Sequence, residues 1–433
     1  TWVVASVVGA LPYLLAGTFA VAGQPWTVVA ADALFESISG YTATGATVFG
    51  GHNRIVDQGS GILLYRQLTQ WAGGMGIVVL VVTVLPSLRA SGLGLIDAEA
   101  PGMGVDRLAP RVRDTAIRFW RLYLGLTVLI AVGFLLAGMG PFDAVAHALT
   151  TASTGGFSTQ DASIGYWNSV AVESVLIVAL ILAAANFTLH SRSWSRKRIT
   201  HFGDHEFRGF LSILAICTLV VSTLLTLDGM APGRALRIGL FNVVTLGTSG
   251  GFGNATGAGS DGDWVRWAAG PQMVLLFLLV FGGCTGSTAG GVKIMRLRVG
   301  MTHAYRTLRG FRRPRALLPV RQGDSTVPDT IVARVAGFMV VYGILVVGGT
   351  VVVAALGTDL VTAVSGVIGS LGNMGPVLGD AGPTASFVDG FSTPARLVLA
   401  VLMLVGRLEI FPMLLMLVAP YRSLRGAGRR GRS

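Results

Sequence analysis

The chain has 433 residues, of which 52% are hydrophobic and only 12% charged, and its formal net charge is +12. Soluble domains carry about 25% charged residues, so this composition excludes an ordinary water-soluble domain. Apolar stretches of roughly 20 residues recur along the chain and predict transmembrane helices. They cover residues 1–22, 62–86, 118–139, 167–189, 208–227, 270–281 continuing to about 300, 330–357 and 394–419. The sequence therefore predicts an all-α polytopic membrane protein.

The beginning of the chain and its cysteines carry two smaller expectations. The first residue is Thr1 rather than Met, and no charged segment with a cleavage site precedes the first apolar run, so we expect a trimmed chain with an earlier N-terminal segment. The two cysteines, Cys217 and Cys284, both fall in apolar segments. We therefore expect neither a disulfide framework nor a cysteine-based metal site.

Basic residues are concentrated in alternate connections between the predicted spans. Four segments hold 24 of the 33 Lys and Arg residues, namely 87–120, 190–208, 293–321 and 421–433. An excess of Lys and Arg marks cytoplasmic loops, so we place these segments and the C-terminus in the cytoplasm. We expect the basic side chains to meet anionic lipid headgroups, and we expect no nucleic acid partner.

Four weaker apolar runs of 10–14 residues lie between pairs of spanning helices, and a run this short suggests a re-entrant segment. They are "VVAADALFESISGY", "FDAVAHALTTA", "ALRIGLFNVVTL" and "DLVTAVSGVIGS". Each leads into a polar, glycine-bearing stretch, at 42–50, 153–161, 248–256 and 372–380. Internal repetition is strong evidence on architecture. We expect four repeats at 1–90, 118–190, 208–300 and 329–420, cytoplasmic connections at 91–117, 191–207 and 301–328, and a basic tail at 421–433.

The glycine-bearing stretches predict an ion-binding site. Non-helical backbone at membrane depth survives only where it is buried or lines a watery path. Four such segments on one axis can direct carbonyl oxygens at a dehydrated monovalent cation, while the negative C-terminal ends of the half-helices favour positive charge. The alternative is a set of glycine-rich extracellular turns, but four copies in equivalent places favour the first interpretation. The candidate filter residues are Thr42, Ala43, Thr44, Gly45, Ser153, Thr154, Gly155, Gly156, Thr248, Ser249, Gly250, Gly251, Gly372, Asn373, Met374 and Gly375.

The sixth predicted span contains "FLLVFGGCTGSTAGGVKIMRL" (277–297), with five glycines in ten residues. One glycine costs a helix about 1 kcal/mol, so this cluster predicts an unwound segment. A phosphate-binding loop does not fit, because Lys293 stands one place late and no strand is predicted beside it. A tight packing kink is the remaining alternative. We favour a flexible loop below the filter that occludes the pore when closed, formed by Gly282, Gly283, Cys284, Thr285, Gly286, Ser287, Thr288, Ala289, Gly290, Gly291 and Lys293, with Arg407 beside it.

Arg407 lies in the middle of the last apolar run, "LVLAVLMLVGRLEIFPML" (397–414). A charge at this depth costs at least ~2.5 kcal/mol and is normally directed to a partner or a watery cavity. Glu409 is two residues away and points to another face of a helix. We therefore expect unwound carbonyls of the 282–291 loop to accept the several hydrogen bonds that the guanidinium donates.

Other polar residues in the apolar segments have open alternatives. Asp32 and Glu36 share a face of the first short helix, where they either attract cations to the outer mouth or brace the helix by hydrogen bonds. Glu173 is expected to be solvated or paired at the interface, and His147 to pack rather than to contact ions. No paired carboxylates, histidine cluster or nucleophile with a base is apparent, so we do not expect an enzyme.

Several of these stretches identify a resemblance. The strings "TATGATV", "RQLTQWAGGMGIVVL", "STGGFST", "TSGGFG", "GGCTGSTAGGVKIMR" and "NMGPVLG" resemble the TrkH/TrkG/KtrB/HKT superfamily of potassium transporters, and most of all its bacterial TrkH branch. The resemblance implies four M1-P-M2 repeats with pseudo-four-fold symmetry around one central pore, and K⁺ as the transported ion. It places filter glycines at Gly45, Gly156, Gly251 and Gly375; Gly45 implies potassium, since serine at this position goes with sodium preference in the plant branch.

The resemblance also implies partners and a location. It predicts a homodimer in the bacterial cytoplasmic membrane, gated by a cytoplasmic nucleotide-binding ring of TrkA or KtrA type, with the nucleotide on that partner and no cofactor on this chain. It also implies an intramembrane gate loop at 282–291 facing an arginine, here Arg407. Family members usually have two further helices before the first repeat.

Two other functions share some of these sequence features. A secondary transporter moving an organic or anionic substrate by alternating access would show two inverted halves, whereas the four units here run in one sense. A KdpA-like subunit of an ion-pumping ATPase shares the four-fold plan, but "GGCTGSTAGGVK" matches TrkH better.

Overall fold

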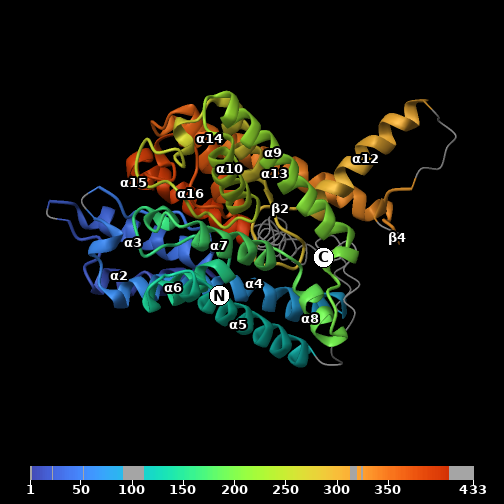
Figure 1. Ribbon diagram of the computed structural model, residues 1–433, viewed down its shortest axis with the longest axis horizontal. Coiled ribbons are helices and arrows are strands. Elements are labelled where there is room, and N and C mark those ends of the chain that lie inside the picture. The colour runs from blue at the N-terminus through green and yellow to red at the C-terminus, as the bar shows by residue number, and fades with distance from the viewer. Residues whose placement is uncertain are drawn as a thin grey trace, which may run out of the picture.

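The computed structural model describes residues 2–21, 23–51, 53–90, 112–312, 319–322 and 325–408. Helices dominate this part of the chain (Figure 1). Several expectations concern residues outside it: most of the connection 91–117, Arg313 and Arg315, Glu409, and everything beyond residue 408.

Four short helices occupy the positions of the four weak apolar runs. They are α3 (Trp26–Tyr41), α6 (Pro141–Ala152), α10 (Pro232–Gly247) and α14 (Leu360–Gly372). Proline at or just before the first turn starts the first three, since its missing N–H would have no partner there. The side chain of Asp359 caps the fourth and accepts from the backbone N–H of Val361 at 2.9 Å.

Each short helix ends in a left-handed residue. This residue follows the C-terminal cap of the first three, with φ of 50° at Ala43, 53° at Thr154 and 56° at Ser249, and is itself the cap of the fourth, with φ of 51° at Asn373. A left-handed residue is a common way to stop a helix. The chain then continues in extended form through the glycine-bearing stretch.

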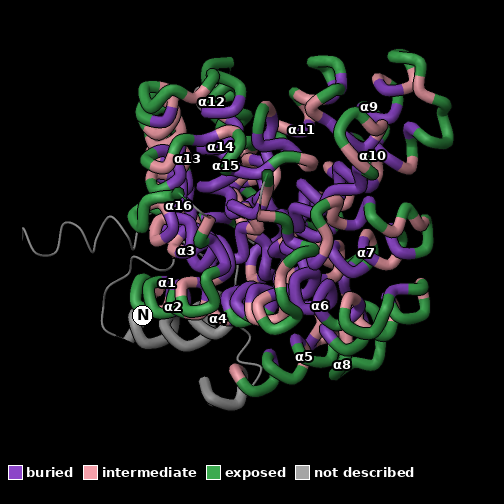
Figure 2. Tube along the Cα trace, turned by 90° about the vertical axis from the view of Figure 1, so that its left-hand side faces the viewer, coloured by how far each residue is buried: buried purple, intermediate pink, exposed green. Residues whose placement is uncertain are grey.

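Several other helices flank the short ones. They are α4 (Ser60–Ala90), α5 (Val112–Leu136), α9 (His205–Leu227), α13 (Asp329–Ala355) and α16 (Thr393–Arg407). Within the described residues, Ala116–Leu136, His205–Leu227 and Asp329–Ala355 are long and apolar enough to cross a membrane. In Figure 2 the buried trace lies in the middle of the molecule, and the helices at its margin are largely exposed.

The structure corrects two of the expected spans. Residues 167–189 were expected to form one helix, but α7 (Val170–Ala183) ends early and α8 (Phe187–Arg196) leaves at 94°. Asn186 causes the break, because its side chain accepts from the N–H of Thr188 at 2.8 Å and starts a new helix. The first apolar run is likewise not a single span, since α1 (Trp2–Gly9) and α2 (Leu11–Leu15) are both short.

The predicted break in the sixth span is confirmed. The helix α11 (Ala269–Val280) stops where the glycine cluster begins, and α12 (Ile294–Arg312) starts after it. Between them, β1 (Phe281–Gly282) and β2 (Val292–Lys293) pair in parallel and hold the ends of residues 281–293 side by side. We call residues 281–293 the inner loop.

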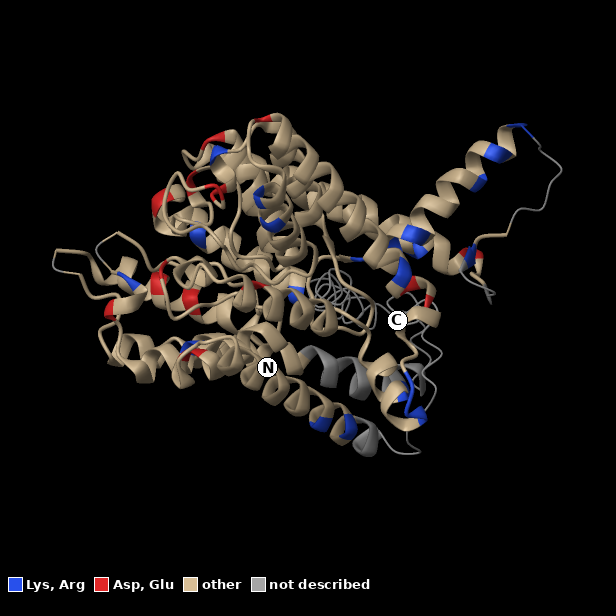
Figure 3. Cartoon of the chain, in the orientation of Figure 1, with Lys and Arg blue, Asp and Glu red and all other residues tan. Residues whose placement is uncertain are grey.

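The remaining elements are short. They are η1 (Ile55–Asp57), η2 (Ser163–Tyr166), η3 (His201–Gly203), η4 (Trp264–Arg266), β3 (Arg321–Gln322), β4 (Ser325–Thr326), η5 (Gly379–Ala381) and α15 (Phe387–Gly390). Lys and Arg gather about α8 and α12, whereas most Asp and Glu lie toward the opposite end of the molecule (Figure 3). This separation follows the uneven charge along the sequence.

Candidate functional site

The four glycine-bearing segments meet in a closed ring. A Cβ added to Gly45 would overlap the carbonyl oxygen of Gly155, and one on Gly156 would lie 2.5 Å from the carbonyl oxygen of Gly250. A Cβ on Gly251 would lie 3.2 Å from Cδ of Pro376. Finally, a Cβ on Gly375 would overlap the carbonyl of Gly45, which closes the circle. We call this arrangement the ring.

The ring depends on glycine for two reasons. Each missing side chain leaves room that the next segment's backbone occupies. In addition, Gly45, Gly156 and Gly251 have φ of 84°, 87° and 68°, a region that other residues rarely adopt. Gly375 is not among the positive-φ residues. The structure thus brings the predicted filter residues together and makes the fourth segment different in conformation.

Small hydroxyl side chains at the start of three segments brace the short helices. Thr42, Ser153 and Thr248 each donate to the carbonyl four residues earlier, at 2.7, 3.1 and 2.7 Å. Each of these carbonyls also accepts from the backbone N–H of the same residue, at 2.8, 3.3 and 3.0 Å, so the hydroxyl adds a second bond at the helix end. The hydroxyl hydrogens are therefore engaged within each helix end.

The left-handed residues bind different neighbours. Thr154 donates to Thr288 of the inner loop at 3.4 Å, and the hydroxyl of Ser249 accepts from the N–H of Gly290 in that loop at 2.7 Å. In the fourth segment, Asn373 donates to Thr44 at 3.1 Å and to the carbonyl of Met403 on α16 at 2.9 Å. The second and third segments thus contact the loop directly.

Polar residues at a fixed distance before the ring glycines hold the outer parts of the segments. Nine residues before three of the four ring glycines, Glu36 accepts from the N–H of Val48 at 3.0 Å, His147 bonds Ser158 at 2.9 Å, and Asn242 donates to Asn254 at 3.0 Å. For Asp32 and Glu36, the contacts favour bracing over attraction of cations. Asn242 was missed from the sequence, although its spacing from Gly251 matches the others.

Three buried or partly buried ion pairs surround the ring. Arg66 contacts Glu36 at 2.6 Å, Arg396 contacts Asp32 at 2.6 Å, and Arg237 contacts Glu173 at 2.8 Å. The pairing expected for Glu173 is present. Each pair joins a short helix to another helix, so the charges tie the short helices into the body of the molecule.

Arg66 also reaches the second segment. Its Nη1 donates to the carbonyl of Ser158 at 2.8 Å, and its guanidinium carbon lies 3.6 Å from the centre of the Phe157 ring. One turn further along α4, Gln70 donates to the carbonyl of Gly155 at 2.8 Å and accepts from the N–H of Phe157 at 3.0 Å. Sequence reasoning did not select Arg66 or Gln70, because their partners lie some 85–92 residues away.

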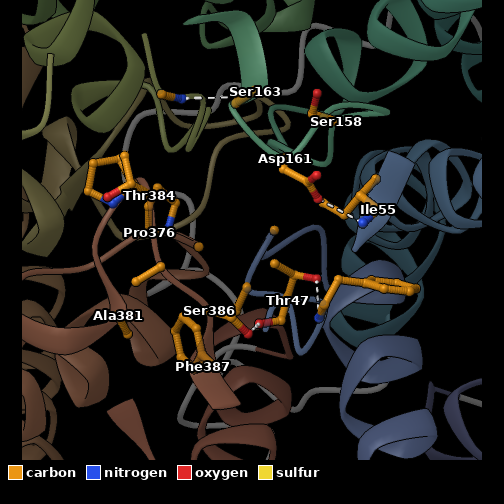
Figure 4. A pocket seen from close by; sticks show the side chains of 18 of the residues that line it. Thr47, Ile55, Ser158, Asp161, Ser163, Pro376, Ala381, Thr384, Ser386 and Phe387 are labelled. Atoms are coloured by element: carbon orange, nitrogen blue, oxygen red, sulfur yellow. Dashed lines mark hydrogen bonds between the residues drawn. The ribbon is translucent and has the colours of Figure 1, made fainter. Parts of the chain in front are cut away.

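A cavity of about 250 Å³ opens above the ring and is lined by all four ring glycines. Its wall includes polar side chains from several segments (Figure 4). On one side Asp161 accepts from the N–H of Ile55 at 2.7 Å, and elsewhere on the wall Ser386 donates to the carbonyl of Thr47 at 3.1 Å. The cavity wall combines polar and apolar groups.

The inner loop lies on the other side of the ring. The predicted contact of Arg407 is present: its Nη1 donates to the carbonyl of Thr288 at 3.1 Å, and its Nη2 donates to the carbonyl of Gly73 on α4 at 3.1 Å. Lys293 donates to the carbonyl of Ala289 within the loop. A small cavity of about 40 Å³ is lined by Gly290, Asn373, Arg407 and neighbouring residues.

Backbone oxygens are the ligands that this site offers. Among the described residues, no three His, Cys, Asp or Glu side chains gather in a way that would hold a metal ion. The ring instead brings together extended backbone from four segments next to the C-terminal, partly negative ends of four helices. Such a site suits a weakly held monovalent cation.

Known proteins show where this chain belongs. The sequence profile of the TrkH family, described as cation transport protein, matches residues 1–423. The chain is 41% identical to the Trk system potassium uptake protein TrkH of Halomonas elongata, over 95% of this chain and 82% of that protein. It is 34% identical to TrkH of Escherichia coli K12, over 96% and 83%.

A solved structure agrees with the sequence. The crystal structure of the potassium transporter TrkH from Vibrio parahaemolyticus matches with a TM-score of 0.83 and 37% identity, covering 96% of this chain and 82% of that one. The mainly helical fold is therefore like that of TrkH, and the chain is a membrane protein. The family match and the identities together show that the chain belongs to the TrkH family of cation transport proteins.

Proposed function

We propose that the protein takes up K⁺ across the cytoplasmic membrane through a channel-like pore, down the electrochemical gradient of the ion. The closed ring of four glycine-bearing segments carries this proposal, together with the relatives that are named potassium uptake proteins. The four units, at 1–90, 118–190, 208–300 and 329–420, act as M1-P-M2 repeats with pseudo-four-fold symmetry around that pore.

The ring acts as the selectivity filter. Carbonyl oxygens from residues 42–45, 153–156, 248–251 and 372–375 replace the water around a K⁺ ion. The short helices direct their C-terminal ends toward the ion and favour positive charge. The contacts of Glu36, Arg66 and Gln70 hold the first and second segments in place around the ion.

The inner loop acts as the gate. Its contacts with Thr154, Ser249 and Arg407 support a closed position beneath the filter. Arg407 adds a second barrier, because a positive charge opposes the passage of a cation. Opening requires the loop to exchange these hydrogen bonds for others.

Regulation comes from a cytoplasmic partner. The protein works as a homodimer in the bacterial inner membrane, with the C-terminus in the cytoplasm, and binds a TrkA-like nucleotide-binding ring on its basic face. The exposed basic end of α12 supports this face, because Arg312 lies there. Changing Arg312, Arg313 and Arg315 to Glu weakens recovery of such a subunit in a pull-down; equal recovery leaves lipid headgroups as their only partner.

Ion flux in proteoliposomes tests the main proposal. Purified protein is reconstituted, and uptake of K⁺, Rb⁺ and Na⁺ is measured at equal gradients. We expect K⁺ and Rb⁺ to enter much faster than Na⁺, with no organic ion competing. Equal uptake of Na⁺, or uptake that requires a coupled substrate, would overturn the proposal.

A further inference from the structure

We propose that Glu206 is a positioning residue that anchors the base of the inner loop and thereby sets its closed position. The inference rests on the proposed gate role of that loop. Glu206 lies in the first turn of α9, yet its side chain is only 5% exposed. Glutamate is almost never fully buried unless it is paired, so its surroundings call for an explanation.

One carboxylate oxygen of Glu206 collects three hydrogen bonds from the two ends of the loop. It accepts from the N–H of Thr285 at 2.8 Å, from the hydroxyl of Thr285 at 2.9 Å and from the N–H of Met295 at 3.1 Å. Residue 285 lies early in the loop and residue 295 directly follows it in α12. Glu206 therefore ties the segment entering the loop to the helix leaving it.

The simpler explanation is that Glu206 only stabilises the start of its own helix, where negative charge is favourable. Asp204 already serves α9, since its side chain accepts from the N–H of Phe207 at 2.8 Å. The bonds of Glu206 go instead to Thr285 and Met295, on the loop and on α12. The N–H of Met295 is one of the unpaired donors at the beginning of α12, so Glu206 caps a neighbouring helix.

The anchor complements the contacts at the middle of the loop. Arg407 holds the carbonyl of Thr288, and Ser249 holds the N–H of Gly290. These two contacts fix the part of the loop next to the ring, whereas Glu206 fixes its base. Without Glu206 the base is still held by the pairing of β1 with β2 and by the bond from the N–H of Cys284 to the carbonyl of Ala184 at 2.9 Å. It has lost three hydrogen bonds, however, so the closed arrangement is less populated.

Two readouts test this inference separately from the gate itself. Basal K⁺ flux without a regulatory partner reports whether the pore opens. The loop's own Cys284, which is fully buried, reports whether the loop moves, through its rate of reaction with a membrane-permeant thiol reagent. The labelling is done in a Cys217→Ala background, so that only one thiol remains in the chain.

Glu206→Ala removes the acceptor, and we expect both readouts to rise, each by about tenfold, because hydrogen bonds to a charged group are strong. Glu206→Gln keeps an acceptor oxygen without the charge and should give a smaller rise. Thr285→Val removes only one of the three donors and should also give a small rise. K⁺ over Na⁺ selectivity should not change, because the contacts of Glu206 are with the loop and α12 rather than with the ring.

Asp204→Ala is the matched control, since it removes the cap of α9 but leaves the loop contacts in place. Folding of every variant is checked by monodisperse elution. Unchanged Cys284 labelling in folded Glu206→Ala overturns the inference, as does an equal rise in Asp204→Ala. If labelling rises while flux does not, the anchor is supported and the gate role in the proposed function fails.

Discussion

The outer surroundings of the ring and the inner loop beneath it are held in different ways. Around the ring, arginine and carboxylate side chains pair directly, as in Arg66 with Glu36 and Arg396 with Asp32. At the inner loop, the charged side chains of Arg407, on α16, and Glu206, on α9, bond to uncharged backbone groups. Breaking a buried ion pair strands a charge and costs about 3–5 kcal/mol, whereas a hydrogen bond to a charged group contributes about 1.5–3 kcal/mol. The segments around the ring are thus held more strongly than the loop.

The largest expected effect comes from breaking an outer pair. Arg66→Ala leaves Glu36 buried without its partner and removes the bond to Ser158, so we expect about 3–5 kcal/mol lower stability. Thermal unfolding in detergent measures this. Arg54→Ala is the control, because Arg54 forms an exposed pair with Asp161 at 3.0 Å, worth about 0–1 kcal/mol. Similar small shifts in both variants would contradict the rigid-ring description.

The second prediction concerns ion preference. Gly45→Ser and Gly251→Ser should both lower K⁺ over Na⁺ discrimination, because each places a side chain in a positive-φ position of the ring. Gly45→Ser should have the larger effect, since its Cβ overlaps the carbonyl of Gly155, whereas that of Gly251 meets Pro376 at 3.2 Å. Gly59→Ser, whose Cβ has open space, is the control. The ratio of K⁺ to Na⁺ flux in proteoliposomes measures this preference. An unaltered ratio in an active Gly251→Ser protein would count heavily against the proposed filter role of the ring.

The third prediction releases the middle of the loop. Arg407→Ala loses two bonds from a charged group, so basal K⁺ flux should rise about tenfold or more and depend less on the regulator. Deletion of several loop residues should act in the same direction. Arg407→Lys keeps the positive charge but cannot donate to both carbonyls. It therefore separates the effect of the hydrogen bonds from that of the electrostatic barrier. If Arg407→Ala folds and conducts no better than the parent, the residue is only a structural anchor.

The smallest effect concerns the connection at residues 187–204, where Nε2 of His201 bonds Nδ1 of His190 at 3.1 Å. Burial lowers the pKa of His201 below its usual 6.5, although nearby Asp204 acts in the opposite direction. The unfolded segment therefore binds protons more readily, and the connection should lose stability as pH falls below 6.5. Hydrogen exchange of residues 187–204 at pH 7.5 and 5.5, corrected for intrinsic rates, measures this. His201→Asn should reduce the difference between the two pH values, and an unchanged difference would assign it to another group.

The sequence predicted the short helices well because their boundaries are local. Proline or Asp359 marks each start, and the glycine-bearing stretch marks each end. The bend at Asn186 was missed because the apolar pattern continues across it, although asparagine is one of the residues that commonly start a helix. The contact of Arg407 with the loop could also be predicted, because a charged side chain in the middle of an apolar run needs hydrogen-bond acceptors nearby.

The residues that hold the site together were harder to find. Gln70 and Glu206 bind backbone groups 79–89 residues away, and such pairings are set by how helices pack rather than by a motif. Arg66 pairs with Glu36 across 30 residues, in the same way. A single sequence records that these side chains need partners but not which backbone groups provide them.

The four left-handed residues Ala43, Thr154, Ser249 and Asn373 differ in side chain, and this difference has a consequence for how the protein can evolve. In an assembly of four identical subunits, any substitution at this position appears four times. Here one gene encodes all four positions, so each quadrant can change alone. Of these four side chains, only Thr154 and Ser249 form hydrogen bonds with the loop, so a single mutation there changes a contact between the ring and the loop while the other two positions keep their partners.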